Sequence, residues 1–376
     1  MKRIYITSLH LGHGGVEMAI SLMANALVKR GYSVTILCTY NLGEPVYELD
    51  PKVKIKYLTK VRPNKEEVKE AFHQKKFITL LKEGLYSVYV LYLKKKTMIQ
   101  AIKKIKEGCI ISTRNEHSVL LSKYGNEKVK KIAQLHHDHR FDPKLIKDFK
   151  EHYNNIDYFV LLTDLLCEEV KRMMFQNTHT KCLVIPNFMD LTVCGDKSAS
   201  KPQVIAVGRL HEVKRFHLLV DMWKDKELQE KAHLMIVGDG DEKENLEKQI
   251  KENNLEKCIT LAGALEHEEV MKKMQESQIY AMTSETEAFP FVLIEAMANG
   301  LPIVSYDVRV GPAAIIENEK TGYLIKENNR QDFVEKLKKL LSEEDTRKQM
   351  SEEAVRQCMQ YKEDAVMKKW MNIIED

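Results

Sequence analysis

Short runs of apolar residues alternate with longer amphipathic stretches along the whole chain. Runs rich in Ile, Val and Leu are typical of parallel strands buried on both faces, and apolar residues at helical spacing predict the helices between them. This alternation indicates doubly wound α/β sheets with right-handed crossovers. The predicted strands are residues 3–8, 33–38, 53–58, 109–112, 131–135 and 158–162, then 203–207, 234–237, 259–263, 279–282, 302–305 and 322–325.

The alternation is broken at residues 184–190, and the stretch 191–202 that follows is short, polar and without periodicity. Such a stretch is typical of a hinge, and 376 residues exceed what one core holds, so we predict two Rossmann-like domains. A final helical pattern contains Trp370 and needs a surface to pack on. The predicted parts are a first domain 1–185, a linker 186–201, a second domain 202–360, and a C-terminal helix 361–376 that packs back on the first domain.

The composition is that of a soluble globular protein, with 44% hydrophobic and 30% charged residues. Seven cysteines are scattered without a Cys-x-x-Cys pair, so neither a disulfide framework nor a zinc site is indicated. The start of the chain lacks a long apolar run, and the longest uncharged one, Leu85 to Leu93, is short for a membrane span. We therefore expect a cytoplasmic protein.

The charge is distributed unevenly. Residues 1–190 carry 32 basic and 20 acidic side chains, whereas residues 191–376 carry 27 and 35. Between Lys52 and Glu107 there are 16 basic and 5 acidic residues, interleaved with aromatic and aliphatic ones. This pattern suits peripheral docking on an anionic membrane, at the inner face of the cytoplasmic membrane, and equally a solvated lysine-rich helix face. No motif supports nucleic-acid binding.

A glycine-rich loop follows the first predicted strand and opens a helix. Gly14 and Gly15 would let the backbone approach a phosphate or a sugar closely, although a plain tight turn needs the same residues. The spacing differs from Gly-x-Gly-x-x-Gly, and no acidic residue is placed to hold an adenosine ribose. A hydride-transfer cofactor is therefore disfavoured.

Three histidines follow the strand that ends near Leu135. His136 stands where ligands collect in open α/β sheets, beyond the carboxyl end of a strand, and His137 and His139 come directly after it. A substrate contact, a structural histidine and a metal ligand are all compatible with this position. Because neighbouring side chains of an extended chain point in alternate directions and no carboxylate completes a site, metal binding is disfavoured.

The stretch from Ser284 to Gly300 combines a polar loop with a helix that Pro290 introduces. The amides at such a helix start can seat a phosphate. Glu287 in the loop and Glu295, roughly 12 Å further along, could accept hydrogen bonds from sugar hydroxyls. A helix cap with a surface carboxylate would look the same in sequence. Arg209 and Lys214 follow the first strand of this half, where they could neutralise a diphosphate.

Together these residues resemble the retaining glycosyltransferases of family 4, which have the two-Rossmann GT-B architecture, over nearly the whole chain. Glu287 and Glu295 match the family's Glu-x7-Glu signature. The other matching elements are Gly14-Gly15-Val-Glu17, Pro186-Asn187 with Asp190, Gly208-Arg-Leu with Lys214, and Val237-Gly-Asp-Gly240.

The resemblance implies that the second half binds a nucleoside diphosphate sugar and the first half binds the acceptor, with the two sheets facing across a cleft. Glu295 would bind the ribose, and Glu287 would hold the donor sugar. Arg209 and Lys214 would stabilise the leaving diphosphate. His136 would contact the donor sugar by its register with the strand, with its neighbour His137 as the alternative. The remaining donor contacts implied are Gly14, Gly15, Gly208, Phe289, Pro290, Phe291 and Val292.

The implied activity is transfer of a hexose or N-acetylhexosamine, with retained configuration, to a glycan or lipid-linked acceptor of the bacterial envelope. The donor would be a UDP-sugar, with GDP-mannose next, and neither a metal nor a further cofactor is expected. Two alternatives have different consequences. A non-catalytic relative would bind nucleotide or lipid without turnover, and an oxidoreductase would be stabilised by NAD instead of UDP.

Overall fold

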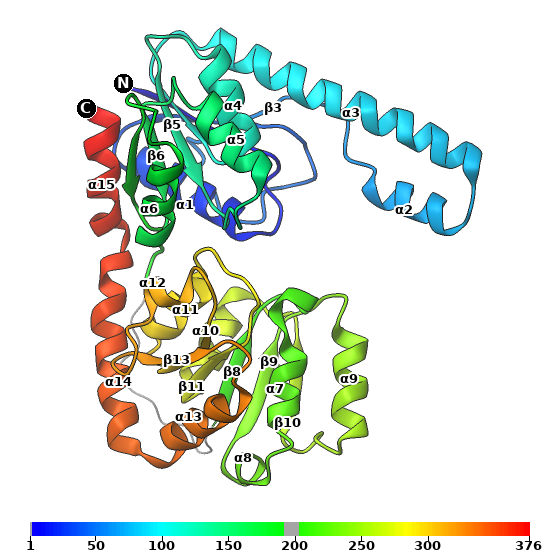
Figure 1. The fold of residues 1–376 in the computed structure, drawn as a ribbon, viewed down its shortest axis with the longest axis vertical. Coiled ribbons are helices and arrows are strands. Elements are labelled where there is room, and N and C mark those ends of the chain that lie inside the picture. The colour runs from blue at the N-terminus through cyan, green and yellow to red at the C-terminus, as the bar shows by residue number, and fades with distance from the viewer. Residues whose placement is uncertain (1, 192–202) are drawn as a thin grey trace. The chain divides into compact units, whose positions relative to one another are not determined.

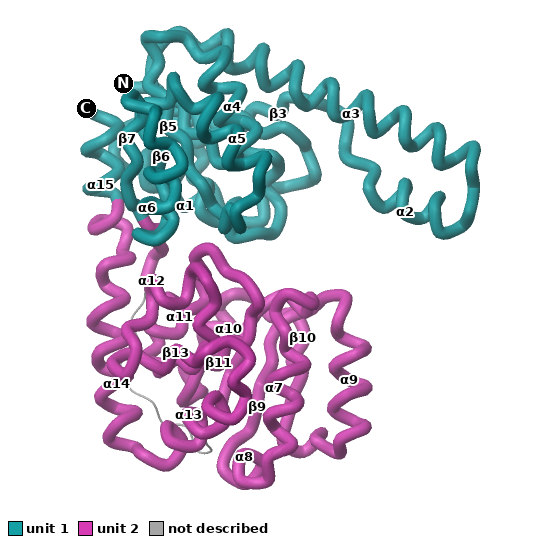
Figure 2. Tube along the Cα trace, in the orientation of Figure 1, with its two compact units in different colours: residues 1–185, 367–376 teal, residues 186–366 magenta. Residues whose placement is uncertain are grey.

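A computed structural model describes residues 2–191 and 203–376. The chain divides into two compact units, which Figure 2 shows in different colours. Unit 1 comprises residues 1–185 and 367–376, and unit 2 comprises residues 186–366. The chain therefore passes between the units twice, at residues 185–186 and 366–367. Most of the predicted linker, residues 192–201, lies outside the described residues.

Unit 1 is built on a parallel sheet of seven strands in the order β3-β2-β1-β4-β5-β6-β7. The first strand lies in the middle of the sheet, so successive strands are added outward in both directions. Its central strands are almost fully buried, which explains their continuous apolar sequences. The strands are β1 (Arg3–Ser8), β2 (Ser33–Cys38), β3 (Lys54–Tyr57), β4 (Cys109–Ser112), β5 (Lys130–Leu135), β6 (Tyr158–Leu161) and β7 (Lys181–Val184).

The helices of unit 1 connect these strands, and the end of the chain also contributes to the unit (Figure 1). Lys2 Nζ donates to the Ile374 carbonyl, and the Tyr158 hydroxyl donates to Asp376, so the last helix packs on the edge of this unit. The helices are α1 (Gly15–Lys29), α2 (Lys65–His73), α3 (Phe77–Lys104), α4 (Asn115–Tyr124), α5 (Pro143–His152), α6 (Asp164–Met173) and the end of α15 (Glu363–Glu375).

Unit 2 has a six-stranded parallel sheet in the order β10-β9-β8-β11-β12-β13. One contiguous core joins its strands to flanking helices and includes Trp223, Tyr306 and Phe333. The strands are β8 (Gln203–Val207), β9 (His233–Val237), β10 (Ile259–Gly263), β11 (Ile279–Met282), β12 (Ile303–Asp307) and β13 (Gly322–Lys326). The helices are η1 (Glu212–Lys214), α7 (Phe216–Met222), α8 (Lys226–Lys231), α9 (Lys243–Glu252), α10 (His267–Gln275), α11 (Phe291–Ala298), α12 (Pro312–Ile315), α13 (Arg330–Ser342), α14 (Glu344–Cys358) and η2 (Met359–Tyr361).

The predicted fold class of two doubly wound parallel sheets is confirmed, with two differences in the elements. Strand β7 was not predicted, because its exposed edge position does not require an apolar sequence. The C-terminal helix predicted for residues 361–376 begins only at Glu363, as α15. Tyr361 ends η2, and Lys362 is extended between η2 and α15.

Candidate functional site

The sheet of unit 2 reverses its direction of growth between β8 and β11, which are hydrogen-bonded neighbours. In open α/β sheets, ligands bind beyond the carboxyl ends of the strands at this reversal, where the two following loops diverge. The loop after β8 carries Arg209 and Lys214, and the loop after β11 carries Glu287. The sheet order thus brings three predicted site residues to the position where a ligand is expected.

Lys214 and Glu287 contact each other directly. Lys214 Nζ donates a hydrogen bond to Glu287 Oε1 at 2.5 Å, and the two side chains are 26% and 12% exposed. Two further bonds hold the loops together, since Glu285 N–H donates to the Val213 carbonyl and the Thr283 hydroxyl donates to the Lys214 carbonyl. The pair is therefore a fixed contact between the two loops. It leaves a cation and a carboxylate partly accessible.

Two glycines lie beside this pair, and at one of them, Gly311, a side chain would collide with Glu287. A Cβ at Gly311 would lie 2.9 Å from the Cβ of Glu287, and a Cβ at Gly208 would lie 3.6 Å from Lys214 Cε. At Gly238 a Cβ would lie 1.9 Å from the Gly208 carbonyl oxygen. The two turns can thus approach each other only if residue 238 lacks a side chain.

Arg209 differs from Lys214 in its surroundings. It is exposed, and none of the described residues forms a hydrogen bond or ion pair with its guanidinium. Its neighbour Leu210 is 1% exposed and is tied to the next loop by its N–H bond to the Asp239 carbonyl. The backbone at Arg209 is therefore held while its side chain remains available for an anionic ligand.

Helix α11 follows Pro290, as predicted, and its first turn is buried against the rest of unit 2. Phe289 is 7% exposed and packs edge-on against the Tyr361 ring at 5.6 Å between centroids, while Phe291 is 9% exposed. Val292 is partly exposed. The aromatic side chains thus fix the helix start, and the ligand contacts predicted for these positions would come from the backbone.

Glu295 lies one turn further along α11. Its side chain is 11% exposed, and burial raises its pKa to about 7. His267 Nδ1 lies 3.8 Å from its Oε1. A buried carboxylate with so few partners has unused hydrogen-bond acceptors, which ribose hydroxyls could occupy.

The corresponding reversal in unit 1 lies between β1 and β4. Here Gly14 caps α1, and a Cβ at Gly14 would lie 2.2 Å from Glu17 Oε2. Glu17 is 4% exposed, and its Oε1 accepts a hydrogen bond from Arg114 Nη2 at 3.2 Å. Gly14 and Gly15 therefore form a helix start that lies beside a partly buried ion pair, in which the Arg114 side chain is 32% exposed and the Glu17 side chain 5% exposed.

Arg114 was not predicted as a site residue. It follows β4 and reaches the glycine-rich loop across the reversal, and its Nε is buried without a hydrogen-bond partner among the described residues. Nearby, His117 Nδ1 is 3.0 Å from the Thr7 hydroxyl. The only sequence feature that pointed to Arg114 was its position as a charged residue directly after a buried strand. Glu17, the partner of Arg114, lies far away in sequence.

The three histidines after β5 have different environments. His136 is 9% exposed with a buried Nε2 that lacks a partner among the described residues, and burial lowers its pKa to about 3. His137 is exposed. His139 Nε2 lies 2.9 Å from Glu169 Oε2, so this third ring has a structural role. His136 is consequently a neutral ring at physiological pH with one unused nitrogen.

Among the described residues, 2–191 and 203–376, no group of three or more His, Cys, Asp or Glu side chains is arranged to hold a metal ion. In the same residues, no helix combines the length and apolarity needed to cross a bilayer.

A family model described as "Glycosyl transferases group 1" matches residues 195–357, which is most of unit 2. Unit 2 thus contains a region that matches the group 1 glycosyltransferases. The match includes all four of the residues Arg209, Lys214, Glu287 and Glu295, although it assigns no role to any one of them.

Curated relatives align with this transferase from end to end. The amylovoran biosynthesis glycosyltransferase AmsD of Erwinia amylovora is 26% identical, with 96% of each chain covered. An uncharacterized glycosyltransferase of Haemophilus influenzae is 27% identical over the full length of both chains. A Campylobacter jejuni α-1,4-N-acetyl-D-galactosaminyltransferase, whose name specifies an undecaprenol-diphosphate-linked glycan, is 27% identical over 100% of this chain and 99% of its own.

Solved structures establish the fold of the transferase as GT-B. Staphylococcus aureus TarM, crystallised with UDP and α-GlcNAc-glycerol, superposes with a TM-score of 0.78 at 16% identity and full coverage of both chains. Anabaena HepE in complex with UDP and glucose gives a TM-score of 0.72 at 15% identity, also over both full chains.

Proposed function

We propose that the transferase moves a hexose or N-acetylhexosamine from a UDP-sugar to a hydroxyl of a glycan or lipid-linked acceptor, with retained configuration, in bacterial envelope polysaccharide synthesis. The contact between Lys214 and Glu287 at the strand reversal of unit 2 carries this proposal. It joins a cation suited to a diphosphate with a carboxylate suited to sugar hydroxyls, at the edge of the sheet where α/β domains bind nucleotides.

The relatives support the substrate classes. The full-length Campylobacter relative is named for an undecaprenol-diphosphate-linked acceptor, AmsD is named for polysaccharide biosynthesis, and two structural neighbours were crystallised with UDP. Several relatives are named as α-transferases. Because the common UDP-hexoses carry α-linked phosphate, an α-linked product means retention.

In the proposed reaction, the bond between the anomeric carbon and the diphosphate oxygen breaks, and the acceptor hydroxyl attacks the same face. Its proton passes to the departing phosphate oxygen, so the products are the glycoside and a protonated nucleoside diphosphate. Lys214 and Arg209 would neutralise the diphosphate charge as it develops. These fixed cations would supply the stabilisation that a metal ion gives in other transferases.

The remaining residues would position the donor. Glu287 would hold the sugar hydroxyls, and Glu295 would accept bonds from the ribose. The backbone of Gly208 and of residues 289–292 would line the donor. From unit 1, Gly14 and Gly15 would approach the phosphates and the neutral ring of His136 would contact the sugar.

A thermal-shift comparison of UDP, GDP, ADP and NAD tests the proposal. A ligand present at 100 times its dissociation constant stabilises a protein by about 2.7 kcal/mol. We expect stabilisation by UDP and by a UDP-sugar, and a smaller effect of the other nucleotides. Stabilisation by NAD alone would refute the proposal. Nucleotide binding without release of UDP from any UDP-sugar would favour the non-catalytic alternative.

The transferase would act in the cytoplasm, at the inner face of the cytoplasmic membrane, where a lipid-linked acceptor is presented. To act there, the transferase would need a surface that meets the membrane.

A further inference from the structure

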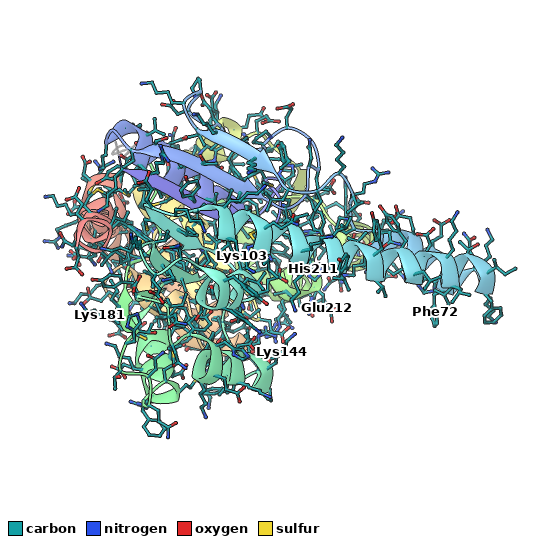
Figure 3. The ribbon with its side chains drawn as sticks, turned by 90° about the horizontal axis from the view of Figure 1, so that it is seen from above. Phe72, Lys103, Lys144, Lys181, His211 and Glu212 are labelled. Atoms are coloured by element: carbon teal, nitrogen blue, oxygen red, sulfur yellow. The ribbon has the colours of Figure 1, made fainter. Side chains whose placement is uncertain are left out.

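Helices α2 and α3 form a hairpin that extends from the sheet of unit 1 (Figure 1). Helix α3 has 28 residues and is therefore about 42 Å long. Figure 3 shows the hairpin in the perpendicular view, with Phe72 near its tip and Lys103 near its root. This segment is longer than a connection between β3 and β4 requires.

One face of α3 is covered by the hairpin itself. Asn64, which precedes α2, donates hydrogen bonds to the Glu83 carbonyl at 2.9 Å and to the Glu83 carboxylate at 2.7 Å. The Ser87 hydroxyl donates to Asn64 Oδ1 at 2.8 Å. Ala71 of α2 is 3% exposed. Glu83 and Ser87 thus lie on the face of α3 that packs against the rest of the hairpin.

The root of α3 is anchored in unit 1. Met98 and Ile102 are fully buried there, and Lys94 Nζ forms an ion pair with Glu116 of α4 at 2.6 Å. Helix α3 therefore cannot rotate freely about its axis. Along its outer half, the face opposite Glu83 and Ser87 points away from α2.

The opposite face is apolar and exposed. At 100° per residue, its large side chains fall within an arc of about 120°, centred away from Glu83 and Ser87. They extend over about 22 Å of helix. Single exposed apolar residues are common on proteins, but a contiguous row of this length marks an interaction surface. We call this row the α3 stripe: Phe77, Ile78, Leu81, Leu85, Val88 and Tyr92, which are 57–88% exposed.

Lysines surround the α3 stripe. Lys75 and Lys76 precede it, Lys82 flanks it, and Lys95 and Lys96 follow it. The one acidic residue between positions 75 and 96 is Glu83, which faces Asn64 instead of the stripe. An apolar strip with a cationic border is the arrangement by which amphipathic helices bind anionic lipid surfaces.

We propose that the α3 stripe and its lysines dock this transferase on an anionic phospholipid bilayer. The apolar side chains would enter the boundary between head groups and acyl chains, and the lysines would contact the anionic head groups. Pairing with a second copy of the chain is the weaker explanation, because it would bring two sets of lysines together. The role of this docking rests on the proposed function, because docking would give the transferase access to a lipid-linked acceptor.

Vesicle co-sedimentation of the full chain tests the docking directly. The probes are phosphatidylcholine vesicles with and without phosphatidylglycerol. We expect binding to the vesicles that contain phosphatidylglycerol and a loss of binding at high salt, because the lysine contribution is screened. The double variant Leu81→Glu, Leu85→Glu should bind at least about tenfold more weakly. Phe175→Glu, which changes a 74% exposed residue after α6, should bind like the parent chain.

A charge variant separates the two contributions. Lys75→Gln, Lys76→Gln and Lys95→Gln together should abolish the preference for anionic vesicles. The same charge change in unit 2, Lys243→Gln, Lys251→Gln and Lys257→Gln, should leave it intact. Circular dichroism and the UDP-induced thermal shift should be unchanged in all of these variants, since none changes the nucleotide site.

Equal binding of the parent chain and the stripe variant to anionic vesicles would overturn the inference. So would concentration-dependent dimers in light scattering that the stripe variant abolishes, together with no vesicle binding. The UDP shift reports separately on the proposed function. A chain that binds vesicles but not UDP would contradict the proposed function alone, and one that binds UDP but no vesicles would contradict the docking alone.

Discussion

The Nζ of Lys214 and the Oε1 of Glu287, from loops that follow two neighbouring strands, are 2.5 Å apart. The ammonium group and the carboxylate are therefore hydrogen-bonded to each other before any nucleotide sugar binds. A bound diphosphate sugar would give both side chains stronger hydrogen-bond partners. Its phosphate oxygens would accept from the Lys214 ammonium group, and its hydroxyls would donate to the Glu287 carboxylate. The contact is thus a brace between the loops, and under the proposed function it would also serve as a preformed binding site.

Replacing Lys214 by Ala should lower UDP-sugar turnover by at least about 100-fold, because the leaving diphosphate loses a fixed cation. The change should cost only about 1 kcal/mol of unfolding free energy, since the pair is partly exposed. Release of UDP and urea unfolding measure the two effects. Lys248→Ala, which removes a lysine that is 73% exposed, is the matched control. Full turnover by the Lys214 variant would contradict the assigned role.

Glu295 should make the stability of the protein depend on pH. Its pKa is raised by burial from 4.5 to about 7, so the folded state keeps a proton that the unfolded state releases. Stability should therefore fall as the pH rises from 4.5 to 7 and then level off. Glu295→Gln should remove this loss and be more stable by about 1–3 kcal/mol at pH 8.

The same Glu295→Gln variant should bind UDP about tenfold more weakly, because the ribose loses hydrogen bonds to a charged acceptor. Urea unfolding at pH 5 and pH 8, with calorimetric titration of UDP, measures both effects. Glu268→Gln on the exposed face of α10 should change neither. If the Glu295→Gln variant is more stable and still binds UDP as tightly as the parent chain, Glu295 does not bind the ribose and has only a structural role.

The strands were predictable because buried parallel strands have continuous apolar sequences, which short windows reveal. Strand β7 was not predicted, because Lys181 and Cys182 lie at a sheet edge where burial does not dictate the sequence. The loop residues Lys214 and Glu287 were predicted from motif spacing. Their direct contact was not, because it depends on β8 and β11 being neighbours in the sheet.

Arg114 shows where sequence patterns give no information. It pairs with Glu17 across the unit 1 reversal, and neither residue has a local periodicity that would associate them. The basic segment before β4 was predicted as a membrane or a solvated surface, and composition could not distinguish the two. The hydrogen bonds of Asn64 define which face of α3 is covered and which is exposed.

His136 should contribute to turnover as a neutral ring. Its pKa is lowered by burial to about 3, so the unfolded state takes up a proton below pH 6.5 that the folded state does not. Stability should therefore decrease on acidification below pH 6.5, and His136→Gln should reduce this decrease. The variant should also lower turnover about tenfold or more. His137→Gln, at the exposed neighbour, should have little effect on turnover. Equal losses in both variants would contradict the choice of His136.

Gly311 provides a test of the Glu287 position that leaves every polar group in place. Its φ is +97°, and an added Cβ would lie 2.9 Å from Glu287 Cβ. Gly263 has a φ of +74° and no atom within 4 Å of the added Cβ. Both Gly→Ala changes therefore strain the backbone, at a cost of about 1–2 kcal/mol, but only the first displaces Glu287.

We expect Gly263→Ala to lower the melting temperature while UDP-sugar turnover stays near that of the parent chain. Gly311→Ala should lower the melting temperature similarly and reduce turnover about tenfold or more, because a misplaced carboxylate no longer positions the sugar. Parallel thermal scans and UDP-release assays make the comparison. If the two variants keep equal turnover, the Glu287 carboxylate does not need its present position, and the donor-sugar role assigned to it fails.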